Sequence, residues 1–358
     1  MRSHKRWNPV FDENGDVDHF TKKDNQAVAM MDLTRHAKYC LELTATLIPD
    51  RRRGLWALLD YLGPREWGGY WDWAKQYCGA HQGTFGMDDT GATNTEELAS
   101  RLDWVVDFVD NATLAAFLPE KRRQTVYLTR DQQDVPLEGW KSELKKAFKA
   151  GVDTVLEVQL SIAASRKRSF LLSEITEAVA SGQKVLVFTG RKKDLAYLYE
   201  RVCKIPGLCD GAAWALSGDM SGQDRFDACE AYMAHPGPAV LLGTYQSIGE
   251  NVNLQDTDLM LVAMLPWEPY QLTQMEGRPC RPGQKRPVLI KYVVAVGTVD
   301  ERVASTQLEK LADASRLTGD EEMKAIADSL AGLDDRDELL DALCAGWAAG
   351  EWMTAEDE

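Results

Sequence analysis

Short apolar runs alternate with helix-like segments from about residue 170 to residue 296. Two of these runs, Lys184–Phe188 and Ala239–Leu242, are apolar at nearly every position rather than at every second one. Continuous apolar runs of this length are typical of strands buried on both faces, and strands separated by helices form parallel sheets. The sequence therefore predicts an α/β domain in which helices flank a parallel sheet.

The alternation also predicts where each element lies. Gly182 stands directly after one predicted helix and is expected to stop it, since glycine adopts the left-handed conformation common at helix ends. The predicted strands are 124–128, 184–188, 212–216, 239–242, 259–264 and 288–296, and the predicted helices of this region are 137–150, 170–181, 193–202, 223–234 and 271–276.

The first 130 residues have a different pattern. Four helical segments are expected, at residues 25–38, 55–61, 67–77 and 96–109, but no strand is expected before Leu41–Thr46. That strand would have few neighbours with which to pair. This is an unusual beginning for a domain, and residues 1–130 are expected to be mostly helical.

The charge is concentrated at one end of the chain. Residues 311–358 contain fourteen Asp or Glu against three Lys or Arg, which leaves about −4 of the total net charge of −15 on the rest. Local basic patches can still bind phosphates at that charge. The acidic tail is expected to be a solvated helical appendage, although it could instead compete with DNA for a basic cleft.

The composition also bears on the compartment. No run approaches the roughly 18 apolar residues of a membrane span, and the start of the chain, Met1–Trp7, is basic and polar. The seven cysteines are scattered without a C-x-x-C pair, so neither a disulfide framework nor a metal site is predicted. We expect a cytoplasmic protein that does not enter a membrane.

The most specific motif is Gln274–Arg281, which reads Q-x-x-G-R-x-x-R. Its two arginines, Arg278 and Arg281, are three residues apart and can point at one target. The guanidinium matches phosphate oxygens bidentately and keeps its charge, so such arginines can stabilise a transferring γ-phosphoryl group. Taken alone, the motif could equally be a surface salt-bridge cluster with Glu276.

A second motif, Gly243–Leu254, follows a predicted buried strand. Its backbone amides can line up on phosphates, with Gly249 permitting close approach and Thr244 offering a hydroxyl. Either loop alone could be an ordinary connection. Two such loops, in this order in one α/β sheet, favour a phosphate-handling site.

Together these residues resemble the second RecA-like lobe of superfamily 2 helicases in the Swi/Snf-related branch, most of all its annealing-helicase and its phage or bacterial members. Leu43–Leu47 resembles motif III of the first lobe, with Leu47 in place of the usual proline. Three other positions depart from the pattern, namely Asn251, Cys280 and Pro282. The matching segments are Lys184–Phe188 with Arg191 and Lys192 (motif IV), Leu216–Asp219 with Arg225, Gly243–Leu254 (motif V), Leu265–Pro269, Gln274–Gln284 (motif VI) and Val296–Val303.

The resemblance implies a domain order and roles for single residues. Residues 1–130 would be the incomplete end of the first RecA-like lobe with a helical insertion, 131–306 the second lobe, and 307–358 the acidic helical tail. Some apolar surface of residues 1–130 should then be exposed unless another polypeptide covers it. Arg281 would be the arginine finger on the γ-phosphate, supported by Arg278 and Gln274. The other roles would be the ATP cleft for Gly249, Glu250 and Asn253, the DNA backbone for Arg191, Lys192, Arg225 and Thr244, and inter-lobe coupling for Thr44 and Thr46.

Two motifs that a motor of this kind needs are absent from the sequence. It contains neither G-x-x-x-x-G-K-[ST], which cradles phosphates, nor a D-E-A-H box, whose carboxylates hold Mg²⁺ and orient water. In the family, the segment resembling Lys5–Trp7 follows the D-E-A-H box, so the chain is expected to begin just past it.

Three hypotheses follow from this absence. The first is half of a split motor, which uses ATP and Mg²⁺ only with an N-terminal half supplied in trans and tracks the DNA backbone. The second is a truncated product or a non-catalytic DNA-binding and regulatory module. The third is an adaptor for protein contacts, which would not need the two motif VI arginines.

Overall fold

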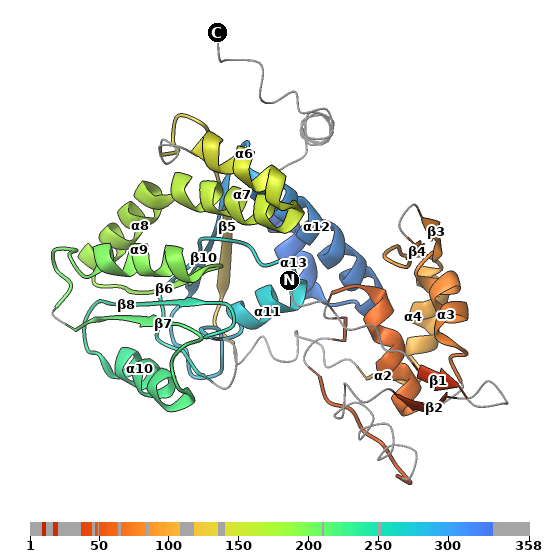
Figure 1. Ribbon diagram of the computed structural model, residues 1–358. Coiled ribbons are helices and arrows are strands. Elements are labelled where there is room, and N and C mark those ends of the chain that lie inside the picture. Colours follow the sequence, from red (N-terminus) through yellow and green to blue (C-terminus); the bar gives the residue numbers. More distant parts are fainter. Residues whose placement is uncertain are drawn as a thin grey trace. The chain divides into compact units, whose positions relative to one another are not determined.

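Six parallel strands form the central sheet of the larger of two compact units in the computed structural model (Figure 1). The units comprise residues 1–106 and 107–358. The strands lie in the order β5-β10-β9-β6-β8-β7. Their bounds are β5 (Lys121–Leu128), β6 (Lys184–Thr189), β7 (Ala213–Leu216), β8 (Ala239–Thr244), β9 (Leu259–Val262) and β10 (Val288–Ala295). The structure describes residues 9–11, 17–20, 37–44, 47–48, 50–63, 66–83, 86–107, 118–134, 140–209, 211–248 and 252–331.

Helices cover both faces of this sheet. Helices α8 and α9 lie on one face and α10 and α11 on the other (Figure 1). Helix α7 was not predicted because its apolar residues are spread around the helix instead of forming one stripe. The helices of this unit are α6 (Trp140–Ala150), α7 (Val152–Arg166), α8 (Arg168–Ala180), α9 (Lys192–Val202), α10 (Gly222–Ala234), α11 (Pro269–Glu276), α12 (Val299–Thr318) and α13 (Glu321–Leu330).

The core confirms the predicted α/β class. All six residues of β6 and all six of β8 are buried, as expected for strands covered on both faces. Helix α8 ends where the sequence predicted, since Gly182 has φ of 76° and its N–H donates to the Val179 carbonyl over 3.0 Å. The predicted strands and helices of this region are all present, with bounds shifted by a few residues.

The edge strand β5 joins the sheet through β10, with Lys121 in register with Val288. Helix α13 packs along β5, where Thr125 Oγ1 donates to the Ser329 carbonyl over 2.6 Å. Helix α13, which lies within the acidic end of the chain, therefore packs on the lobe. The expectation of a purely solvated acidic tail is wrong at Glu322, which forms ion pairs with β5.

The described part of the smaller unit contains short helices and two antiparallel pairs of short strands. The described part of the predicted strand, residues 41–44, is not a strand, and Leu41 and Leu43 are 83% and 88% exposed. The strand prediction is wrong there, since none of the strands described in this unit pairs with it, whereas the expected apolar exposure is confirmed at Leu41 and Leu43. The predicted helix at 25–38 lies almost entirely outside the described residues. The elements are β1 (Pro9–Phe11), β2 (Val17–Phe20), η1 (Arg52–Gly54), α2 (Leu55–Leu62), α3 (Tyr70–Tyr77), β3 (His81–Gly83), β4 (Gly86–Asp88) and α4 (Thr95–Leu102).

Side chains of α3 and α4 form the core of the smaller unit. Trp73 and Tyr77 of α3 are buried, as are Leu98 and Leu102 of α4. Trp73 is therefore a packing residue of this unit. Across both units, none of the helices described is long and apolar enough to cross a membrane.

Candidate functional site

The turn after helix α11 carries the two arginines of the Q-x-x-G-R-x-x-R motif. Helix α11 begins at Pro269, whose fixed φ suits the first helical position, and ends before Gly277. Arg281 Nε then donates back to the Gly277 carbonyl over 3.0 Å. The polypeptide therefore folds over itself in a tight turn that holds the Arg281 side chain.

This turn meets the end of the second predicted motif. The Leu254 N–H donates to the Arg278 carbonyl over 3.1 Å. Arg281 Nη1 also donates to Oδ1 of Asn253. Three residues that the sequence assigned to a nucleotide site, Asn253, Arg278 and Arg281, are thus brought together.

The electrostatic environment of Arg281 is unusual for a partly buried arginine. Both of its acceptors are neutral, an amide oxygen and a backbone carbonyl. Within the described residues, no carboxylate lies within ion-pair distance of Arg281. Its positive charge is therefore not neutralised by these partners and can attract an anion.

The remaining predicted members of the nucleotide site lie in different surroundings. Arg278 is buried, whereas Gln274 is exposed on α11. Gly249 and Glu250 lie outside the described residues. Their predicted role in the ATP cleft stays a prediction.

Glu276, the residue that could have made this motif a surface salt-bridge cluster, is 1% exposed. Its carboxylate accepts from Arg123 of β5, with Arg123 Nη2 to Oε2 at 2.6 Å, and from the hydroxyl of Tyr292 of β10. It pairs with neither motif arginine in the ion pairs of the described residues. The surface-cluster interpretation is therefore wrong for Glu276.

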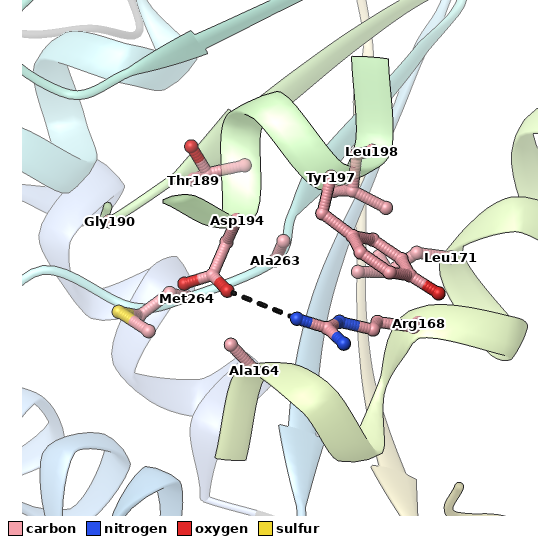
Figure 2. A pocket seen from close by; sticks show the side chains of 10 residues that line it. All are labelled: Ala164, Arg168, Leu171, Thr189, Gly190, Asp194, Tyr197, Leu198, Ala263 and Met264. Atoms are coloured by element: carbon pink, nitrogen blue, oxygen red, sulfur yellow. Dashed lines mark ion pairs between the residues drawn. The ribbon is translucent and has the colours of Figure 1, made fainter. Parts of the chain in front are cut away.

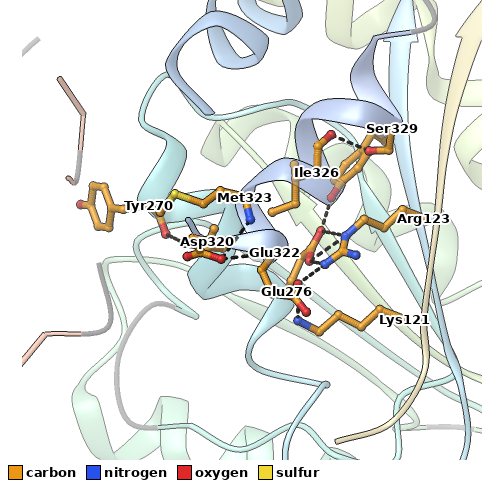
Figure 3. A network of polar contacts seen from close by, with 11 residues as sticks. Lys121, Arg123, Tyr270, Glu276, Asp320, Glu322, Met323, Ile326 and Ser329 are labelled. Carbon is orange, nitrogen blue, oxygen red and sulfur yellow. Dashed lines mark hydrogen bonds and ion pairs between the residues drawn. The ribbon is translucent and has the colours of Figure 1, made fainter. Parts of the chain in front are cut away.

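Arg123 and Glu276 belong to a larger set of polar contacts, which we call the Arg123 network (Figure 3). Arg123 Nη2 also contacts Glu322 of α13, and Lys121 Nζ lies 2.9 Å from the same carboxylate. Motif reasoning missed this network. No alternation in β5 indicated it, because Lys121 to Thr125 are all polar and the residues on the two faces of the strand cannot be told apart by residue type. The members of the network are Lys121, Arg123, Glu276, Tyr292 and Glu322.

The predicted DNA-contact residues gather at the opposite, carboxyl edge of the sheet. Thr189 and Thr244, the last residues of β6 and β8, are paired in register. Arg191 and Lys192 follow β6 directly, and Arg225 lies in the first turn of α10 after β7. Parallel strands thus bring the predicted residues to one edge.

These residues differ in the hydrogen bonds and ion pairs that their polar atoms form with the rest of the protein. Lys192 is exposed and forms a surface ion pair with Asp219. Arg225 Nε is buried without a hydrogen-bond partner in the described residues. Thr244 is buried and its hydroxyl donates to Ser247 Oγ over 3.0 Å. Lys192 is therefore held by one exposed ion pair, whereas no ion pair of Arg225 is found in the described residues.

Arg191 is tied into the protein itself. Its Nη1 donates to the Glu157 carbonyl over 2.9 Å, and its Nε lies 3.1 Å from Asp194 Oδ2. These contacts join helix α7 to the start of α9. A DNA contact by Arg191 stays a prediction, and it would require part of this arrangement to rearrange.

A small pocket lies beside Asp194 at the same edge, lined by α7, α8, α9 and the ends of β6 and β9 (Figure 2). Burial raises the pKa of Asp194, and the nearby Arg191 and Arg168 only partly oppose this. Arg168 lies 3.9 Å from Asp194 and stacks on the Tyr197 ring, 3.6 Å from its centroid. The charged groups beside this pocket are therefore paired with one another.

A buried ion pair supports this edge from within the lobe. Lys167 and Asp300 are almost fully buried, with Lys167 Nζ 2.6 Å from Asp300 Oδ2. Lys167 also donates to the Val293 carbonyl over 3.2 Å. Sequence reasoning missed this pair because its partners are 133 positions apart by number and belong to no recognised phosphate motif.

The predicted coupling residues lie in the smaller unit. Thr44 is exposed, and Thr46 lies outside the described residues. Their role stays a prediction. Among the described residues there is also no group of three or more His, Cys, Asp or Glu side chains that could hold a metal ion.

Comparison with protein families gives one domain match. Residues 166–283 match the helicase conserved C-terminal domain. This stretch contains β6 to β9, helix α11 and both predicted phosphate-handling motifs.

Comparison with curated proteins gives longer matches. The chain is 28% identical over 306 residues to the SWI/SNF-related matrix-associated actin-dependent regulator of chromatin subfamily A-like protein 1 of Xenopus tropicalis, covering 83% of this chain and 32% of that protein. It is 23% identical over 303 residues to the DNA annealing helicase and endonuclease ZRANB3 of Homo sapiens, covering 80% and 27%. The chain thus spans about a third of the length of these relatives. The matches give no support to a phage or bacterial origin.

Among solved structures, the Sulfolobus solfataricus SWI2/SNF2 ATPase core in complex with dsDNA is 20% identical. That match covers 78% of this chain and 62% of the other, with a TM-score of 0.41.

Proposed function

Since this chain carries a helicase conserved C-terminal domain and has SWI/SNF-related annealing helicases among its relatives, we propose that it is the C-terminal motor lobe of an ATP-dependent DNA translocase. In this proposal Arg281 is the arginine finger, and Arg278 supports the turn that carries it. The lobe acts on a nucleotide whose phosphate loop and D-E-A-H box are supplied by residues other than these 358.

The observation that carries the proposal is the state of Arg281. Its guanidinium is held by the neutral oxygens of Gly277 and Asn253, so its direction is fixed while no carboxylate of the described residues balances its charge. An arginine finger needs both properties, because it must reach a phosphoryl group and stabilise the negative charge that develops there. An arginine neutralised by a carboxylate would supply little of either.

The residues present fit one side of a nucleotide site. ATP with Mg²⁺, when bound, supplies the phosphoryl group that is transferred and the cation that neutralises its oxygens. The turn of Arg278 and Arg281 offers positive charge to such a group. The carboxylates and the phosphate loop that would hold Mg²⁺ and the other phosphates belong, in this proposal, to the partner half.

The carboxyl edge of the sheet is the proposed DNA-contacting surface. Lys192 is exposed there, and its ion pair with Asp219 is a surface pair that exchanges readily for a phosphate. Arg225 adds a guanidinium whose Nε has no hydrogen-bond partner in the described residues. Such groups contact the DNA backbone and carry no sequence information, so we expect recognition of DNA form rather than of base sequence.

The first experiment tests for the partner half. The full chain, alone and mixed with a polypeptide that carries the phosphate loop and the D-E-A-H box, is assayed for DNA-stimulated ATP hydrolysis. We expect turnover only in the mixture, because neither half has the complete site. A mixture that stays inert with DNA present contradicts the proposal.

The second experiment tests Arg281 in that mixture. Arg281→Ala should lower kcat by about 10³-fold or more, the order expected for loss of an arginine finger, while DNA affinity changes little. Arg286→Ala is the matched control, since Arg286 lies just after the same turn but pairs with Asp256 and Asp258. Equal loss of turnover and of DNA binding in Arg281→Ala would show that Arg281 is structural.

A third measurement tests the DNA surface on the isolated chain. Binding of duplex and forked DNA should weaken steeply between about 50 and 300 mM salt, because phosphate contacts release counterions. Lys192→Ala should reduce both the affinity and its salt dependence. An affinity that does not change with salt contradicts the proposed backbone contacts.

A further inference from the structure

The turn that carries Arg281 is connected to the C-terminal helix α13 through the Arg123 network. The connection begins at Glu276, the last residue of α11. Its backbone carbonyl accepts from the Cys280 N–H over 3.3 Å, and the next carbonyl, that of Gly277, accepts from Arg281 Nε over 3.0 Å. The position of the Glu276 backbone therefore sets the position of the turn.

The Glu276 side chain is fixed from the sheet. Arg123 Nε lies 3.1 Å from both Glu276 carboxylate oxygens, and Arg123 Nη2 lies 2.6 Å from one of them. The Tyr292 hydroxyl donates to the same carboxylate. A buried carboxylate with these partners has little freedom to move, because leaving them would expose it unpaired in the interior.

Arg123 is itself held by α13. Its Nη2 contacts Glu322, which also receives Lys121 Nζ at 2.9 Å. Two cations and two carboxylates therefore face each other between the sheet and the two helices (Figure 3). Glu322 is well placed for this, since the Asp320 side chain caps α13 and accepts the Glu322 N–H over 2.9 Å.

We propose that Glu322 is a positioning residue for Arg281. Glu322 orients Arg123, Arg123 orients the Glu276 carboxylate, and Glu276 sets the turn from which Arg281 projects. Any event that places α13 on β5 or moves it away therefore changes how precisely the Arg281 side chain is oriented. The consequence for turnover rests on the proposed function, whereas the mechanical link does not.

The alternative is that α13 only covers the edge of the sheet. In that case the hydrogen bonds of Thr125 and Tyr127 to the end of α13 would hold it in place, and Glu322 would add stability without affecting the turn. The two cases differ in which segment of the protein exchanges its amide hydrogens faster when Glu322 is substituted.

Hydrogen–deuterium exchange on the isolated full chain separates these cases. In Glu322→Gln, exchange in the turn at residues 277–284 and at the Leu254 amide should become about tenfold faster, as expected for loss of a charge-assisted contact. Exchange in the β6 and β8 amides should not change. The control is Glu321→Gln, which removes the same charge one residue away, where Glu321 is exposed and pairs only with Lys324 at 3.7 Å in the described residues.

Two outcomes overturn the inference. One is unchanged exchange at 277–284 while α13 itself exchanges faster, and the other is an equal increase throughout the unit. If Glu322→Gln does not fold, Glu322→Asp gives the same test, since it keeps the charge but draws it back from Arg123.

The assembled motor gives a second readout. Glu322→Gln should lower kcat about ten- to hundredfold, as a misplaced catalytic group does, with the KM for ATP and the DNA affinity nearly unchanged. If Arg281→Ala keeps full turnover, the proposed function fails. If Arg281→Ala is inactive while Glu322→Gln matches the unsubstituted chain in both exchange and kcat, only the positioning role of Glu322 fails.

Discussion

Arg123 and Arg281 are arginines of the same lobe in opposite electrostatic environments. Arg123 lies between two carboxylates, those of Glu276 and Glu322, and its charge is balanced inside the protein. Arg281 is held by neutral oxygens, and no carboxylate of the described residues balances its charge. The partners of an arginine, more than the residue type, therefore decide whether it holds the fold together or is available to a ligand.

The largest effect on stability is expected when Arg123 is replaced by an uncharged residue. Arg123→Met should destabilise the larger unit by about 3–5 kcal/mol, because it leaves Glu276 buried without its cation. Arg281→Met should change stability by less than about 0.5 kcal/mol, since no buried partner loses its charge. Urea unfolding followed through exchange of the β10 amides measures both variants. Similar losses of stability in the two variants would contradict the different roles of Arg123 and Arg281.

Tyr292→Phe should have a smaller effect. It removes one hydrogen bond to the Glu276 carboxylate but leaves the ion pair with Arg123, so we expect a loss of about 1.5 kcal/mol. The burial of Tyr292, and then the neighbouring Glu276, raise the pKa of its hydroxyl, so it remains a donor at neutral pH. The same urea experiment measures this change. A loss as large as that of Arg123→Met would mean that the hydroxyl is the main support of Glu276.

Acid should weaken the contact of α13 with β5. Burial raises the pKa of Glu322, but Lys121 and Arg123 outweigh it and hold this pKa below its ordinary value of 4.5. The unfolded chain then binds the proton more readily, so the stabilisation by Glu322 is complete above about pH 4.5 and is lost as the pH falls through the folded pKa. The difference in urea midpoint between the unsubstituted chain and Glu322→Gln should therefore shrink below that pH. A difference that is constant with pH would contradict the ionised pair.

The smallest effect on stability is expected for a substitution of Asn253, which accepts a hydrogen bond from Arg281. Asn253→Ala removes a neutral acceptor of Arg281 and should change the free energy of unfolding by no more than about 0.5 kcal/mol. In the assembled motor it should nevertheless lower kcat severalfold, because Arg281 is then less well directed. A loss of stability without a loss of kcat would place Asn253 with the fold rather than with the site.

Much of the larger unit could be predicted from the sequence because its signals are local. The fully apolar strands such as Lys184–Phe188, the helix stop at Gly182 and the spacing of Arg278 and Arg281 are each read from neighbouring residues. The strand expected at residues 41–46, of which 41–44 are described, failed for the opposite reason. A strand needs a partner, and a short apolar segment carries no information on whether one is present.

The contacts within the site could not be predicted in this way. The pairing of Arg123 with Glu276 joins residues 153 positions apart, and that of Arg123 with Glu322 joins residues 199 apart. Glu322 read as part of a solvated acidic tail because its own neighbours are acidic. Only the packing of α13 on β5 gives it two cations as partners.

By itself, the sequence determined the α/β class of the larger unit and the residues that can handle phosphates, since apolar periodicity and motif spacing are properties of the chain alone. The tertiary structure decided which of the charged residues have a partner of opposite charge. Whether a charge is neutralised depends on what lies within a few ångströms of it, and those neighbours come from strands and helices distant in the sequence. For that reason Arg123 became part of the fold while Arg281 remained available.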